Sequence, residues 1–255
     1  MYSAATEGFP DSCPSPATRT ESSLKGAITP MTQPLSQTGK PLADRYSGAR
    51  KLFLVPNYAF PPNIPEDSLE VLQRYWSEVR DAVGNLERTL GQVTRVYHEM
   101  LFSEGDEGAR LLESLNPQGH GFIQAMCSAG ASLVPTEDRE LVEEHADWQR
   151  VLSIGPISQK VMTAAIDGFQ NTLQARYEKI AERIQDTLQE GESGALFIRD
   201  DHRVQFPADI QVFYVAPPAL DALKRWIAEQ LRAQPPAPDD AALKRSVNVM
   251  TLFVM

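Results

Sequence analysis

Short apolar runs alternate along this chain with longer stretches of helical periodicity, and this alternation constrains the fold more than any other feature. The runs at 51–55, 93–102, 131–134, 194–198 and 209–215 are rich in aliphatic, β-branched or aromatic residues and are predicted as strands. Strands that alternate with helices favour an α/β layer with a mainly parallel sheet. We therefore predict an α/β fold with a small, mainly parallel sheet and long flanking helices.

The stretches between the runs carry apolar residues at helical spacing, and two of them are long. In the helices predicted over 68–90 and 158–189, the apolar positions recur every three or four residues. Seams as regular as these pack along another helix, either within the chain or across a homodimer. The competing interpretation is a helical protein in which the strands are minor additions. Shorter helices are predicted over 106–115, 117–130, 136–154 and 217–233.

Composition divides the 255 residues into one folded unit and two tails. Residues 1–50 are rich in Ser, Thr, Pro and Gly, and their apolar residues are scattered singly, so we predict a disordered tail there. Residues 234–255 begin with a Pro-rich linker and are predicted as a linker and a loose tail, although 247–255 is apolar enough for a docked strand. Between the tails, 51–233 is predicted as a single α/β domain.

Charge and motif content narrow the class of function. A net charge of -10 argues against a nucleic-acid partner, and no apolar run is long enough to predict a membrane partner. Two cysteines exclude a disulfide-stapled scaffold, and we expect a cytoplasmic protein. Glycine-rich phosphate-binding loops and a nucleophile elbow are absent from the sequence.

Acidic and histidine residues gather where three of the predicted strands end. Because ligands of open parallel sheets bind beyond the carboxyl ends of strands, these residues are candidates for one site. Carboxylates and an imidazole can transfer protons near neutral pH or hold a divalent cation. We predict Glu99, Arg176, Asp201 and His202 as catalytic residues, and Glu99, Glu137 and His202 as ligands of a divalent cation, the one cofactor these residues suggest.

Glu99 is the least ordinary of these residues, because its apolar neighbours place it in a strand predicted to be buried. A buried carboxylate without a partner costs free energy. Either Glu99 points to the edge of the sheet, or it has a partner such as Arg95, Arg176 or His202. The charged run at 200–203 has a plainer interpretation as a solvated turn. Negative charge gathers around this site, so a ligand there is expected to be cationic or bridged by a cation.

From Arg176 onward, the second half of the long helix leads into the apolar strand at 195–198 and then to His202. This stretch resembles the C-terminal part of the TraB/ChaN/erythromycin-esterase group, in which a Gly-x-x-His turn follows such a strand. The resemblance implies an acidic residue after an earlier strand, at the position of Glu99. The sequence departs from the pattern at Arg199, where the turn glycine is expected. As a whole the chain also resembles uncharacterised prokaryotic proteins.

Two classes of function follow from these observations. The regular seams and the missing catalytic motifs favour a non-enzymatic binding or assembly module, with a homodimer through the long helices as one form of it. The alternative is a metal-assisted, hydrolase-like enzyme with an acidic and histidine site at the strand ends. The site can form only if the strands at 93–102 and 194–198 are neighbours in one sheet.

Overall fold

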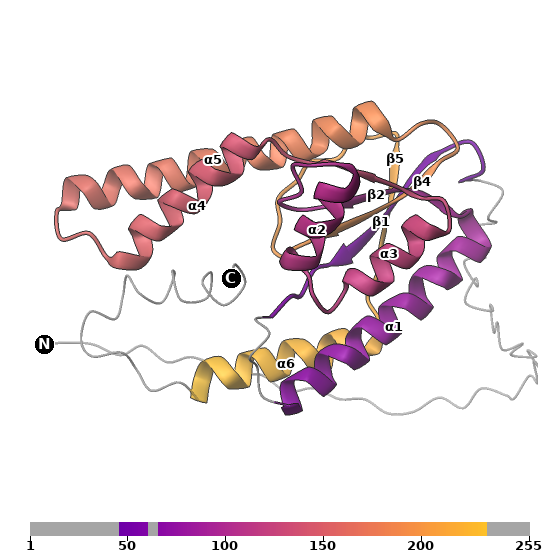
Figure 1. The fold of residues 1–255 in the computed structure, drawn as a ribbon, viewed down its shortest axis with the longest axis horizontal. Helices are drawn as coiled ribbons and strands as arrows, with labels where there is room; N and C mark the ends of the chain where they lie inside the picture. The colour runs from indigo at the N-terminus through magenta and orange to yellow at the C-terminus, as the bar shows by residue number, and fades with distance from the viewer. Residues whose placement is uncertain (1–45, 61–65, 234–255) are drawn as a thin grey trace, which may run out of the picture. The chain divides into compact units, whose positions relative to one another are not determined.

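The computed structural model describes residues 46–60 and 66–233, which lie in one compact unit of the chain. Within these ranges, five parallel strands form one sheet and six helices pack against it or against one another (Figure 1). The predicted α/β class is confirmed. Nearly all of the tail predicted at 1–50, and all of the one predicted at 234–255, lies outside the described residues.

All five predicted strands are present, and the sheet order is β3-β2-β4-β1-β5. Each neighbouring pair is parallel. The elements in chain order are β1 (Arg50–Pro56), α1 (Glu66–Leu90), β2 (Val93–His98), α2 (Gly105–Leu115), α3 (His120–Ser128), β3 (Ser132–Val134), α4 (Arg139–Ile154), α5 (Gln159–Thr187), β4 (Ser193–Ile198), β5 (Ile210–Tyr214) and α6 (Pro218–Ala233).

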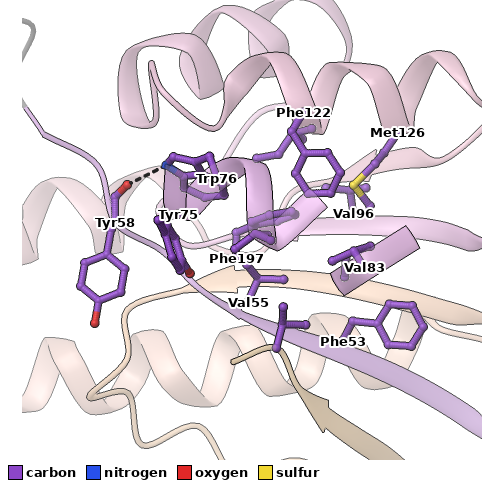
Figure 2. Close-up of a cluster of buried hydrophobic side chains, with 14 of the residues drawn as sticks. Phe53, Val55, Tyr58, Tyr75, Trp76, Val83, Val96, Phe122, Met126 and Phe197 are labelled. Atoms are coloured by element: carbon purple, nitrogen blue, oxygen red, sulfur yellow. Dashed lines mark hydrogen bonds between the residues drawn. The ribbon is translucent and has the colours of Figure 1, made fainter. Parts of the chain in front are cut away.

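Helices cover the two faces of the sheet unequally. On one face, Phe53 and Phe197 belong to a cluster with side chains of α1, α3 and α6, and Figure 2 shows Trp76 of α1 beside Phe197. On the other face, Leu54 and Leu196 pack against the second half of α5. Successive strand residues point to opposite faces, so each buried strand supplies side chains to both clusters.

Both long apolar seams are buried within this chain. The α1 seam, which includes Leu72, Val79 and Val83, packs against the sheet, and α1 also lies along α6. Helix α5 lies along α4 as a helical hairpin, and Tyr177 and Ile184 in its second half pack on the sheet (Figure 1). The predicted helix-to-helix contacts are therefore made intramolecularly, and the homodimer stays a prediction.

Strand β2 ends at His98, four residues earlier than the sequence predicts. The chain turns there, because the N–H of Leu101 donates to the carbonyl of His98 at 3.2 Å. Met100 occupies the third position of this turn with a φ of 64°, in the left-handed region that glycine ordinarily fills. Glu99 consequently lies in the turn after the strand instead of inside the strand.

Two helices at the carboxyl edge of the sheet begin later than predicted. The sequence predicts a helix directly after Asn116, and although α3 is defined only from His120, Asn116 Oδ1 accepts a hydrogen bond from the N–H of Gly119 at 2.7 Å, as a helix cap does. Thr136 is predicted to cap the next helix, but its hydroxyl donates to the carbonyl of His98 at 2.5 Å. Thr136 thus ties the loop after β3 to the end of β2 at the carboxyl edge of the sheet.

Candidate functional site

Strands β2 and β4 are neighbours, so the site predicted from the sequence can form. His98 pairs with Phe197, and the N–H of Glu99 donates to the carbonyl of Phe197 at 2.9 Å. The chain leaves β1 and β2 toward the face covered by α1 and α3, but leaves β4 toward the opposite face, where Val204 packs. Strand β4 is therefore flanked by two topological switch points, the positions at which open parallel sheets bind ligands.

Glu99 lies at these switch points among polar side chains from β1, β4 and α5. Its Oε1 accepts a hydrogen bond from Asn57 Nδ2 at 3.2 Å. Burial is the largest influence on this carboxyl and raises its pKa, while the nearby charges of Arg176 and Arg199 and the Asn57 hydrogen bond oppose the rise. Glu99 makes no ion pair with either arginine among the described residues, although both act on its pKa.

Glu137 and Arg176 form a buried ion pair beside Glu99. Arg176 donates from Nε to Oε2 of Glu137 at 2.5 Å and from Nη2 to Oε1 at 3.0 Å, and their side chains are 6% and 0% exposed. Oε1 also accepts the N–H of Met100 at 2.5 Å. Burial acts to lower the pKa of Arg176, but the Glu137 carboxylate, together with Glu99 and Tyr177, outweighs it and the pKa is raised. Both oxygens of Glu137 are therefore engaged.

The charged run after β4 is paired with its surroundings. Arg199 donates from Nε and Nη2 to the two carboxylate oxygens of Asp201, at 2.5 and 2.8 Å. Asp200 accepts a hydrogen bond from the Tyr214 hydroxyl and pairs with Lys224 Nζ at 2.7 Å. Burial acts to raise the pKa of Asp200, but these two partners outweigh it and the pKa is lowered. The run is thus more than a solvated turn.

The two histidines near this edge have different surroundings. His98 is buried, and its Nδ1 lies 2.6 Å from the carbonyl of Glu99. Burial lowers the pKa of His98 to about 4, so the ring is neutral at neutral pH and donates from Nδ1 to that carbonyl. His98 Nε2 is buried without a partner in the described part of the chain. His202 instead accepts a hydrogen bond at Nδ1 from the N–H of Val204, at 3.2 Å.

The structure brings together three of the five predicted site residues, namely Glu99, Glu137 and Arg176. Asp201 joins them indirectly, because its partner Arg199 also acts electrostatically on Glu99. That these residues are catalytic stays a prediction. In this arrangement the carboxyl group of Glu99 lies at the two switch points, and two guanidinium groups lie near it, that of Arg176 on α5 and that of Arg199 after β4.

The predicted metal ligands Glu99, Glu137 and His202 are not assembled as a ligand set. Within residues 46–60 and 66–233, no three His, Cys, Asp or Glu side chains are grouped so that they could hold a metal ion. The physical reason is pairing, since Arg176 and a backbone N–H occupy both oxygens of Glu137. His202 shares no hydrogen bond or ion pair with Glu99 in this part of the chain.

Two polar residues of the cluster, Asn57 and Arg199, were not predicted. Each is the first residue after a buried strand, the same place that Glu99 occupies after β2, so strand ends alone could have pointed to them. Asn57 also accepts a hydrogen bond from the fully buried Asn116 at 2.7 Å. Arg95, one of the three candidate partners of Glu99, instead pairs with Glu192 at the opposite edge of the sheet, at 3.3 Å.

The fold and the site define an α/β protein with a polar site at the carboxyl edge of its sheet. No family model, curated protein or solved structure matches the chain. The resemblance of the C-terminal part to the TraB/ChaN/erythromycin-esterase group therefore stays a prediction. None of the described helices combines the length and apolarity that a membrane crossing requires.

Proposed function

We propose that this chain is a binding protein for a small polar molecule and that this molecule contacts Glu99. One observation carries the proposal. Glu99 lies near enough to Arg176 and Arg199 for both to act on its pKa, yet it forms no ion pair with either, and its only side-chain hydrogen bond in the described residues comes from Asn57. A carboxyl group with an uncommitted oxygen, placed at a switch point, is suited to hold a ligand.

Ligand binding requires fewer features of the site than metal-assisted hydrolysis, the alternative function that the sequence suggests. Metal-assisted hydrolysis needs a set of ligands, and Glu137 could join one only by leaving Arg176. Ligand binding needs only the uncommitted groups around Glu99. A cytoplasmic location and association as a homodimer belong to the proposal as expectations from the sequence, and light scattering of the purified chain tests the second.

Nuclear magnetic resonance of the isotope-labelled full chain tests the proposal. Sulfate, acetate, methylammonium and glucose serve as probes of four ligand chemistries. We expect at least one of them to shift the backbone amides of Asn57, Glu99 and Arg199 together, and Glu99→Gln to change the affinity. Shifts for none of the probes, or shifts that avoid these three residues, would contradict the proposal.

Glu192→Gln is the matched control for this experiment. Glu192 is also a partly buried carboxylate that faces an arginine, but it lies at the opposite edge of the sheet. The control should leave the probe affinity unchanged. An equal effect of the two substitutions would mean that the probes respond to the total charge of the chain instead of to a site at Glu99.

A further inference from the structure

The two arginines beside Glu99 share one bonding pattern. Arg176 uses Nε and Nη2 to bind Glu137, and Arg199 uses the same two nitrogens to bind Asp201. In both side chains the third nitrogen, Nη1, has no hydrogen-bond partner among the described residues. Each guanidinium is therefore held in place by its own carboxylate, and its Nη1 is left free to donate hydrogen bonds to a ligand.

These spare nitrogens are not sealed inside the protein. The side chains of Arg176 and Arg199 are only 6% and 17% exposed. Yet within the described residues the buried side-chain nitrogens and oxygens that lack a partner are His98 Nε2 and Arg183 Nε alone. Each Nη1 therefore keeps contact with solvent. An unpartnered donor that reaches water from a largely buried side chain is available to a ligand.

One feature of the surroundings of the two Nη1 atoms suits an anion. Helices α3 and α4 begin at this edge of the sheet, and the N-terminus of a helix attracts anions. Three of the four acids nearby are already paired, Glu137 and Asp201 with the arginines and Asp200 with Lys224. The expectation of a cationic ligand counted these acids without their partners, and Glu99 is the one that has no ion pair.

We infer that the site takes an oxyanion, the carboxylate, phosphate or sulfate group of a small molecule, which accepts hydrogen bonds from Nη1 of Arg176 and of Arg199. The inference rests on the proposed binding function and names its ligand class. Guanidinium groups suit this task because their planar donors match the geometry of oxyanions. Their carboxylate partners hold them in place before the ligand arrives, which lowers the entropy lost on binding. Glu99 then lies against a hydroxyl or a protonated oxygen of the same ligand.

Calorimetric titration of the full chain with sodium sulfate, sodium phosphate and sodium acetate tests the inference, and methylammonium chloride is the cationic comparison. Sulfate keeps one charge state across the working pH range, and the three anions tell tetrahedral from planar oxyanions. We expect at least one anion to bind, and Arg199→Gln to weaken that binding about tenfold or more, as the loss of a charge-assisted hydrogen bond does. Arg95→Gln, at the opposite edge, should change nothing.

Whether Glu99→Gln strengthens or weakens binding distinguishes an anionic ligand from a cationic one. Removal of a negative charge beside the site should tighten binding of the anion, whereas a cationic ligand would be lost. Binding of methylammonium that disappears in Glu99→Gln would overturn the oxyanion inference and leave the binding proposal standing. Failure of all three anions would overturn the oxyanion inference, and the binding proposal would fall as well only if methylammonium and glucose also failed to bind. Because Asp201 is 70% exposed, water can solvate its carboxylate when Arg199 is replaced, so the Arg199→Gln variant should fold. Arg176→Lys is a second variant, which keeps the positive charge but removes the spare nitrogen.

Discussion

A buried cationic side chain lies at each of the two edges of the sheet, and the two side chains differ in whether a hydrogen-bond donor is left without a partner. At the amino edge, Lys51 is 1% exposed, and its Nζ donates to the carbonyls of Tyr46, Ala49 and Gly191 at 3.2, 3.2 and 2.9 Å. An ammonium group has three hydrogens, so nothing remains for a ligand. At the carboxyl edge, Arg176 is also buried, but it keeps one nitrogen without a partner.

This difference teaches that burial of a charge does not by itself mark a functional site. Lys51 ties two loops to the start of β1 and has the properties of a structural residue. Arg176 and Arg199 combine fixed positions with hydrogen-bonding capacity that the described residues leave unused. The unused capacity, and not the charge, separates the two edges.

The largest expected effect comes from breaking the buried ion pair at the carboxyl edge. Arg176→Met leaves the Glu137 carboxylate buried without its cation, and we expect the free energy of unfolding to fall by about 3–5 kcal/mol. Urea unfolding followed by circular dichroism measures the loss. The double variant Arg176→Met, Glu137→Leu should recover much of it, because no buried charge is left unpaired. A loss below about 1 kcal/mol in the single variant would mean that solvent already screens the pair.

The pH dependence of stability should carry the next largest effect, through His98. Its pKa is about 4 in the folded chain, against about 6.5 when unfolded, so the unfolded chain binds the proton first. The contribution is therefore complete above about pH 6.5 and is lost as the pH falls toward 4, by on the order of 3 kcal/mol. Urea unfolding at a series of pH values measures the slope, which His98→Asn should flatten. An unchanged slope in that variant would contradict the prediction.

A crossed pair of substitutions sharpens the comparison of the two edges. Lys51→Met removes the donor for three backbone carbonyls and should cost about 1–3 kcal/mol of stability, while anion binding stays unchanged. Arg199→Gln should show the reverse, with a loss of about 1 kcal/mol or less because its partner is exposed, but with weakened anion binding. Chemical unfolding and calorimetry on both variants check this. If the two variants changed stability and anion binding in the same way, the two edges of the sheet would not differ in function.

The smallest expected effect comes from Met100, whose φ of 64° is strained for a residue with a side chain. Met100→Gly should raise the free energy of unfolding by up to about 1 kcal/mol, because relief of this strain is partly offset by the backbone entropy of glycine. Gly191→Ala, at a φ of 77°, should act in the opposite direction. Thermal unfolding compares the two. A destabilised Met100→Gly would show that the Met100 side chain contributes more than its backbone conformation costs.

Parts of the site could be predicted from the sequence because they depend on local pattern. Glu99 stood out as an acid in an apolar run, and Arg176, one of its three candidate partners, does act on its pKa, although the ion pair of Arg176 is with Glu137. The turn that releases Glu99 from the strand could not be foreseen, since methionine rarely adopts the left-handed conformation of Met100. Arg95 could not be rejected as the partner without knowing that it lies at the opposite edge of the sheet.

By itself the sequence determined the elements and the fold class, because the spacing of apolar residues along strands and helices is a local property. Only the tertiary structure decided which charges meet. Glu137 and Arg176 are 39 residues apart and pair because β3 and α5 bring them to the same edge of the sheet. Ion pairs of this kind depend on sheet order and helix placement, which no local pattern records. Those pairs leave two guanidinium nitrogens uncommitted in an acidic region, and these are the nitrogens that we infer to bind an anion.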